Sequence, residues 1–152
     1  AGISVVPFEA MSGSVSVAEF QYLPALNGEV KPNQIRNTAL DDLVFDQEIG
    51  GFFRDAVFKE LSLVGVKTNS ERRTLSGQVR EFFIDDLGYN VDWKIRVVYR
   101  VSGPEKTLYE SEKVTQRRTA KAGDPFATMN ESIKLSIDEI IKDPAFLKAI
   151  NE

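Results

Sequence analysis

The clearest pattern in the chain is a strict alternation of apolar and mostly charged residues over positions 91–102. Successive side chains of a β-strand point to opposite faces of the sheet. The alternation therefore predicts a long strand with one face on a core and the other toward solvent or a partner. The apolar positions are Val91, Trp93, Ile95, Val97, Tyr99 and Val101.

Two more long strands are predicted on either side of this one. Residues 74–87 hold Phe82, Phe83 and Ile84, which would make both faces apolar, as in a central strand that is covered on two sides. Residues 107–119 carry many charges, which suits an edge strand. Short turns over 87–90 and 102–106 join the three strands, so the strands should run antiparallel.

Helical spacing of apolar residues predicts a first amphipathic helix over about 46–64, with Asp46 as its N-cap and Gly65 as its left-handed C-terminal cap. Gly50 and Gly51 lie within its first turns and weaken helix propensity. Either the helix starts late or a glycine permits a close backbone contact. The apolar positions are Ile49, Phe52, Phe53, Ala56, Val57, Leu61 and Val64.

A second amphipathic helix should begin after Asp124, which can cap it, with Pro125 in the first helical position. It should end near Lys142 because Pro144 disfavours helix at the residue before it, and 145–150 can add one more turn. Its apolar stripe consists of Phe126, Met129, Ile133, Ile137, Ile140 and Ile141.

The N-terminal part of the chain is less regular. Residues 3–8 are rich in β-branched side chains and predict a strand, whereas 11–45 contain many turn-forming residues and predict a long irregular connection with one short strand at 15–22. The element order is β-α-β-β-β-α. We expect a single α+β domain over 1–152, an antiparallel sheet of about four strands with both helices packed on one face.

Composition narrows the chemistry. The net charge is −4 and the longest Lys/Arg clusters are pairs, which argues against nucleic-acid binding. The chain has no cysteine and no histidine, so thiolate and imidazole nucleophiles, general bases and metal ligands are excluded. We therefore expect no catalytic site, no metal site and no cofactor.

Carboxylate pairs at Asp41-Asp42 and Asp85-Asp86 are the remaining candidates for acid/base or metal chemistry. Adjacent residues of a strand point to opposite faces, and Asp before Gly88 commonly makes turn hydrogen bonds. We interpret Asp85-Asp86 as turn residues, and Asp41-Asp42 as solvated residues before a helix.

Two surfaces could contact a partner. The polar face of the alternating strand carries Arg96 and Arg100, opposite acidic residues of the next strand; such a ladder of cross-strand ion pairs is also common on solvated sheets. The connection over 11–45 is unusually apolar, so it either packs on its own domain or presents an anchor. The candidate contact residues are Phe20, Tyr22, Leu23, Leu26, Arg96 and Arg100.

Several segments resemble a family. The helix with Phe52-Phe53-Arg54-Asp55-Ala56-Val57-Phe58-Lys59-Glu60-Leu61, its end at Val64-Gly65-Val66, the strand Leu75-Ser76-Gly77-Gln78-Val79 and the alternating strand are similar to small bacterial lipoproteins of the YajG type. In outline they also resemble auxiliary lipoproteins of ABC-type transport systems. The likeness lies in pattern and order, covers Ile35 to the C-terminus, and transfers no catalytic residue.

The resemblance implies a periplasmic domain of a Gram-negative cell, anchored to the outer membrane by a lipidated cysteine that would precede Ala1. Such a domain would act in envelope assembly or transport through a protein or lipid component. An alternative is a carrier of small apolar ligands, with a pocket between sheet and helices lined by Phe52, Phe53, Trp93 and Phe126. A third hypothesis is a hydrolase that uses Asp85 and Asp86. The oligomeric state stays open.

Overall fold

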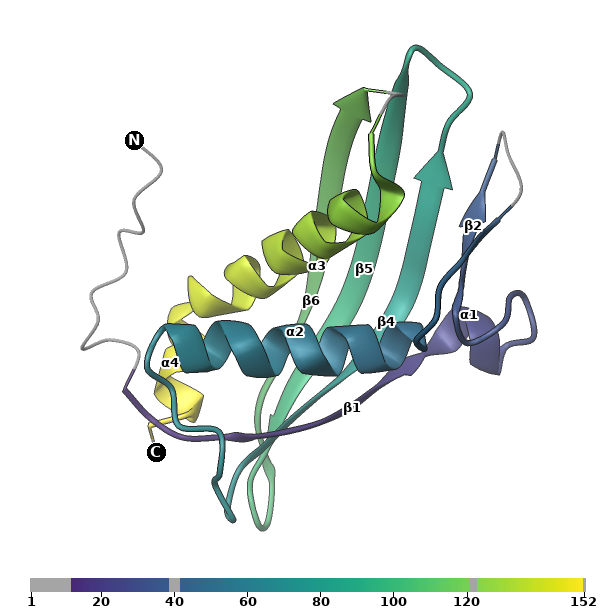
Figure 1. The fold of residues 1–152 in the computed structure, drawn as a ribbon. Helices are drawn as coiled ribbons and strands as arrows, with labels where there is room; N and C mark the ends of the chain where they lie inside the picture. The colour runs from purple at the N-terminus through teal and green to yellow at the C-terminus, as the bar shows by residue number, and fades with distance from the viewer. Residues whose placement is uncertain (1–11, 39–41, 121–122, 152) are drawn as a thin grey trace, which may run out of the picture.

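A computed structural model describes residues 12–38, 42–120 and 123–151, in which one layer of helices covers one face of a sheet (Figure 1). The sheet has six strands in the order β3-β2-β4-β5-β6, with β1 also paired to β4. Its centre is the predicted antiparallel meander of β4 (Thr74–Asp85), β5 (Asn90–Ser102) and β6 (Thr107–Ala120). The α+β class is confirmed, as is the edge position of β6.

The sheet differs from the prediction at the other edge of β4. Both β1 (Ser16–Tyr22) and β2 (Gln34–Asn37) pair with β4 in parallel, one after the other along its length, and the short helix α1 (Leu23–Leu26) lies between them. β3 (Leu43–Val44) pairs antiparallel with β2. The sheet is therefore mixed and has more than four strands.

The region over 11–45 is thus more regular than expected. The strand predicted at 15–22 is confirmed, but β2 and β3 hold only four and two residues, too few for alternation to be visible in the sequence. The strand predicted at 3–8 lies outside the described residues.

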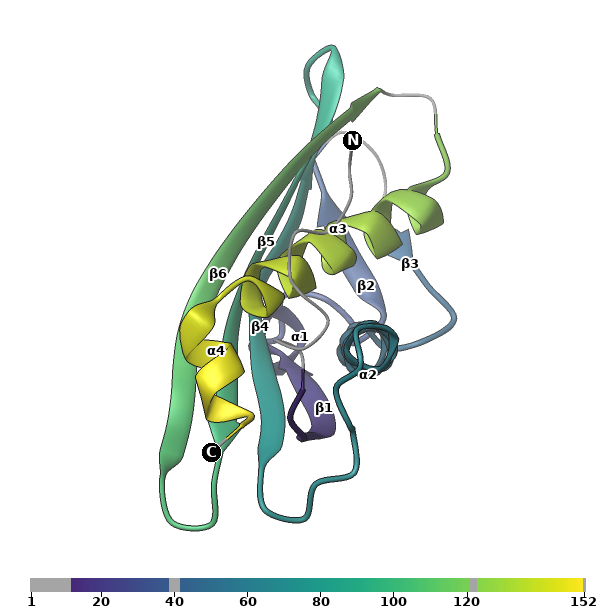
Figure 2. The same ribbon diagram turned by 90° about the vertical axis from the view of Figure 1, so that its left-hand side faces the viewer.

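A β-bulge at Arg80 explains the apolar run in β4. The pairing with β5 skips this residue, so the buried positions change from Leu75, Gly77 and Val79 to Phe82 and Ile84. Phe83 then points to the face opposite the helices, where it is half-buried. The expectation that β4 is covered on both faces is wrong, because α2, α3 and α4 all lie on one side of the sheet (Figure 2).

The helices follow the predicted stripes. α3 (Pro125–Ile141) begins after Asp124, whose carboxylate accepts a hydrogen bond from the Phe126 N–H at 3.0 Å, and α4 (Pro144–Ala149) supplies the extra turn. α2 spans Ile49–Leu63 and ends before Gly65, whose φ is 95°. The predicted cap Asp46 is wrong: Glu48 holds the N-cap position, and its side chain makes no capping hydrogen bond.

The core lies between the helices and the inner face of the sheet. A chain of aromatic contacts crosses it: Phe20 stacks on Phe53 at 5.7 Å, Phe53 meets Phe82 at 6.2 Å and Phe82 meets Trp93 at 6.2 Å, centroid to centroid. Tyr99 is fully buried and its hydroxyl is 2.6 Å from that of Ser136 on α3. One continuous cluster of buried side chains connects the long strands β4, β5 and β6 to the helices α2, α3 and α4.

Candidate functional site: the outer face of the sheet

The face of the sheet opposite the helices is open to solvent within the described residues. We call the surface formed there by β4, β5 and β6 the outer face (Figure 2). Its side chains come from the polar positions of the alternating strand and from the residues beside them on the neighbouring strands. The alternation that buries Trp93 and Ile95 therefore presents Lys94 and Arg96 on the outer face.

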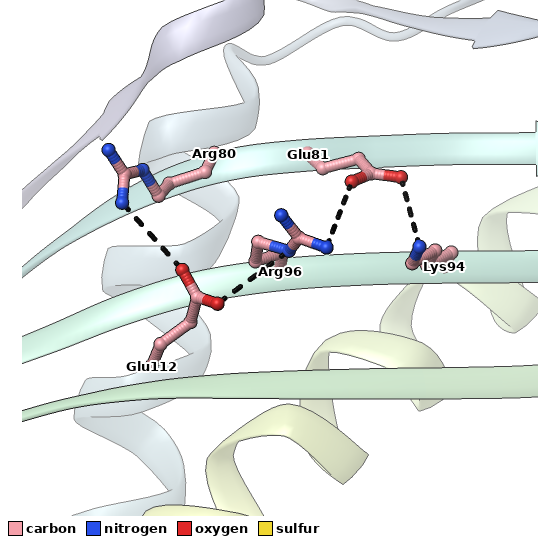
Figure 3. A network of polar contacts seen from close by, with 5 residues as sticks. All are labelled: Arg80, Glu81, Lys94, Arg96 and Glu112. Carbon is pink, nitrogen blue, oxygen red and sulfur yellow. Dashed lines mark ion pairs between the residues drawn. The ribbon is translucent and has the colours of Figure 1, made fainter.

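Five charged residues form one connected network on this surface (Figure 3). Glu112 lies between two guanidinium groups, with Arg80 Nη1 at 3.7 Å and Arg96 Nε at 3.7 Å. Glu81 lies between Arg96 Nη2 at 3.9 Å and Lys94 Nζ at 3.6 Å. Three cations thus share two carboxylates, and the bulge at Arg80 places Arg80 and Glu81 both within reach of the network.

Two further ion pairs flank the network. Arg100 Nε donates to Glu110 Oε1 at 2.6 Å, and Arg118 Nε donates to Asp92 Oδ1 at 2.8 Å, each between residues directly opposite on β5 and β6. The hydrogen bond from Arg118 lowers the pKa of Asp92 below its usual value. The predicted ladder of cross-strand pairs therefore exists.

These ion pairs contribute little to the stability of the sheet. The side chains of the network are 34–51% exposed, and exposed pairs typically contribute only about 0–1 kcal/mol each. Burial of the inner face stabilises the sheet far more. The charged groups of the outer face can therefore exchange their partners for those of another molecule at small cost to the fold.

Some of the predicted contact residues lie on the surface of the structure, and others are buried in its core. Arg96 and Arg100 lie on the outer face, and Leu26 is 66% exposed at the end of α1, beside the half-buried Leu23. Phe20 and Tyr22 are each only 5% exposed, because alternation in β1 turns both rings to the core. This corrects the expectation that these two residues contact a partner.

The carboxylate pairs serve local structure. Asp85 Oδ1 accepts hydrogen bonds from the Leu87 N–H and the Thr38 hydroxyl, both at 3.3 Å, while Asp86 is largely buried and its N–H donates to Thr38 Oγ1 at 2.9 Å. Asp42 accepts from the Asn37 N–H at 2.9 Å, and Asp41 lies outside the described residues. In the part of the chain that the structure describes, no group of three or more acidic side chains could hold a metal ion.

The four residues proposed to line an apolar pocket do not meet in one cavity. Phe53 and Trp93 belong to the core, whereas Phe52 packs on Phe126, which is 47% exposed, at 5.8 Å near the first turns of α2 and α3. Trp93 lines a cleft of about 100 Å³ at the end of the sheet. Trp93 also borders an open hollow of about 500 Å³ on the other side of the sheet, but Phe52, Phe53 and Phe126 line neither of these two hollows.

One polar cluster at the edge of the sheet was not predicted. The carboxylate of Asp143 accepts hydrogen bonds at Oδ2 from the Tyr109 hydroxyl at 2.6 Å and from Lys113 Nζ at 2.9 Å. Its Oδ1 accepts from the Ala145 N–H at 3.0 Å and caps α4. The Asp-Pro dipeptide signals the cap, but the partners on β6 become visible only once the register is known.

The chain matches no protein-family model, and no curated protein matches it either. Solved structures share its fold. Protein XCC0632 from Xanthomonas campestris, of family DUF330, has a TM-score of 0.64 and 13% identity over 91% of this chain and 85% of that one. CT253 from Chlamydia trachomatis has a TM-score of 0.64 and 9% identity, with 91% and 99% covered.

A dodecamer of PelC from Paraburkholderia phytofirmans has a TM-score of 0.51 and 12% identity, with 100% of this chain and 96% of that chain covered. Several bacterial lipoproteins match with TM-scores of 0.42 to 0.49, which is too distant to support an argument about this chain. Among the described helices, none is long and apolar enough to cross a membrane. The likenesses establish the shared fold.

Proposed function

We propose that this chain is a non-catalytic domain of a membrane-anchored lipoprotein in the periplasm of a Gram-negative bacterium, and that it binds an envelope component through its outer face. The resemblance to YajG-type lipoproteins motivates the anchor, and the segments that carry it form α2, β4 and β5 in the implied order. Anchoring to the outer membrane is part of the same proposal.

The observation that supports binding is the contrast between the two faces of the sheet. Helices bury the inner face, whereas no described segment covers the outer face, whose exposed ion pairs lie beside the apolar side chains of Phe83, Val98 and Val114. Polar clusters elsewhere, such as Tyr109 with Asp143, hold helices in place. We infer that the outer face is the surface by which the domain acts.

The mixed charge of the outer face favours a protein partner over a lipid surface. Acidic and basic groups alternate across the network, whereas attraction to an anionic membrane needs a cluster of several Lys/Arg residues without acidic neighbours. Excess positive charge in the network suits a partner surface with an additional carboxylate. The dodecamer formed by PelC supports a role of this fold in assemblies, and we extend that role to this chain as part of the proposal.

The anchor is tested on the complete natural precursor. Cells expressing it are fed an alkyne-tagged fatty acid, and the protein is examined for label in the envelope fraction. We expect labelled protein, and loss of label when the cysteine that accepts lipid is replaced by serine. Unlabelled protein that fractionates without membranes would contradict the anchor.

The outer face is tested by charge reversal combined with site-specific photo-crosslinking at position 98, in the middle of this surface. We expect a discrete adduct in the envelope that is lost in Arg96→Glu, although that variant should lose only about 1–2 kcal/mol of stability, because both ion pairs of Arg96 are exposed. The control is Lys59→Glu, which makes the same charge change on the exposed side of α2. Equal adduct yields in both variants would exclude a role of Arg96, and the absence of any adduct from position 98 would exclude the outer face.

A further inference from the structure

Strand β6 forms a long open edge. It pairs with β5 on one side, and no described segment pairs with its other side, which Figure 2 shows along the left of the molecule. Alternate residues of an edge strand direct N–H and C=O groups away from the sheet, where another strand can bind them. The edge extends over the 14 residues Thr107–Ala120, long enough for extensive pairing.

Acidic and basic residues are separated along this edge. On the outer face, the first half of β6 carries Glu110 and Glu112, and the second half carries Arg118. The middle position on that face is Val114, an apolar side chain that is 48% exposed. A strand with acid at one end, base at the other and an apolar centre is complementary to an antiparallel copy of itself.

We propose that two copies of this chain join their β6 edges antiparallel, with the two-fold axis passing through Val114. In this register Glu110 of each copy lies opposite Arg118 of the second copy, and the two Val114 side chains meet at the axis. Opposite charges in directly facing positions stabilise such a pair of strands, and like charges destabilise it.

Other registers are less favourable. Parallel pairing in register would place Glu110 opposite the same residue of the second copy. Moving the axis to Lys113 or Glu112 would bring two like charges together on it. With the axis at Val114, the β6 side chains that point to the inner face also bring no like charges together. Ser111 faces Arg117 of the second copy, and Lys113 faces Thr115 of the second copy.

The existing ion pairs do not prevent this arrangement. Glu110 already binds Arg100, and Arg118 already binds Asp92, yet the side chains of Glu110 and Arg118 remain 48% and 68% exposed. One carboxylate can pair with two guanidinium groups, as Glu112 does in its ion pairs with Arg80 and Arg96. The dimer would place both outer faces side by side, and it requires neither the anchor nor another envelope protein.

Sedimentation equilibrium of the purified chain over a wide concentration range tests the dimer. We expect a monomer–dimer equilibrium in which Glu110→Arg or Arg118→Glu alone weakens association about tenfold or more, because each creates two like-charged facing pairs. The double variant Glu110→Arg/Arg118→Glu should restore it, since opposite charges face each other again. Lys94→Glu, which breaks an outer-face pair away from the edge, should leave association unchanged.

The register is tested with cysteine, which the natural chain lacks. Facing Cβ atoms of antiparallel strands lie roughly 4.5–5.5 Å apart, close to the separation that a disulfide needs. Val114→Cys should therefore crosslink to its copy under mild oxidation, whereas Val98→Cys, also on the outer face but on β5, should not. A chain that stays monomeric at millimolar concentration without crosslinking, or a dimer insensitive to both charge reversals, would overturn the proposal. Neither result bears on lipid labelling.

Discussion

Gly50 and Gly51 are neighbours in α2 but have very different surroundings. A side chain at Gly50 would overlap the carbonyl oxygen of Phe20 in β1, because the helix passes directly over that strand. A side chain at Gly51 would lie 2.9 Å from Nε2 of Gln47, the end of a flexible side chain that can move. The late start of the helix and the close backbone contact, which the sequence offered as alternatives, therefore both occur.

Replacing each glycine by alanine should give opposite results. We expect Gly50→Ala to lower the free energy of unfolding by about 1–3 kcal/mol, since backbone must shift to admit the methyl group. Gly51→Ala should be neutral or stabilising by up to about 1 kcal/mol, because alanine has the higher helix propensity. Urea denaturation of both variants measures the difference. Equal gains in both variants would show that helix propensity, and not contact with Phe20, determines the outcome.

At the scale of elements, Asp143 joins α4 to the edge strand. Partial burial acts to raise the pKa of this carboxyl group, but hydrogen bonds from Tyr109, Lys113 and the Ala145 N–H together hold the pKa below its usual value. Hydrogen bonds that favour the ionised form stabilise the folded state at every pH where the group is ionised. The same carboxylate therefore caps a helix and ties it to β6.

The pH dependence of stability should reveal this role. Because the pKa is lower in the folded state, the contribution of Asp143 is complete above the unfolded value of about 3.9 and is lost as the pH falls through the folded-state pKa. Asp143→Asn should cost about 1–3 kcal/mol at neutral pH and flatten the acid limb of the stability curve.

Urea denaturation between about pH 6 and about pH 2 gives this comparison. Asp124→Asn, which alters the equivalent cap of α3, is the matched control and should cost less at neutral pH. Parallel stability curves for the natural chain and Asp143→Asn would contradict the assignment.

The elements that could be predicted are those whose pattern is long. β5 and α3 extend over 13 and 17 residues, so alternation or helical spacing repeats many times in each. β2 and β3 are too short for a repeat, and their place beside β4 is fixed by pairing between distant segments. Phe20 and Tyr22 did carry a signal, since Glu19 and Gln21 alternate with them in β1.

The same distinction applies to the outer face. Arg96 and Arg100 could be assigned to it from alternation alone, because they belong to the most regular alternation in the chain. The position of Glu81 in the network could not be predicted, since the bulge at Arg80 shifts the alternation. Each residue after Arg80 in β4 therefore points to the face opposite the one that uninterrupted alternation would give it. A local irregularity in one strand thus determines which charges form the network.

For the whole molecule, the continuous core suggests how the chain unfolds. Phe146 of α4 is fully buried and contacts Tyr109 of β6 at 5.6 Å, while the backbone of Ile150 accepts a hydrogen bond from the Ser14 N–H at 3.0 Å. The C-terminal helix thus closes the core beside the start of the described chain. We infer that the helices and the sheet form one cooperative unit, a single domain.

Trp93 is the sole tryptophan and lies in the core, so its fluorescence reports on packing while far-ultraviolet circular dichroism reports on secondary structure. If the chain unfolds as one unit, the two signals should follow the same urea transition. Phe146→Ala should shift both curves together by about 3–5 kcal/mol, because it leaves a cavity in the core. Phe58→Ala, a change at a residue of α2 that is 49% exposed, should shift them by no more than about 0.5 kcal/mol. A variant Phe146→Ala that loses helical signal first and keeps the Trp93 transition in place would instead show that α4 unfolds separately from the sheet.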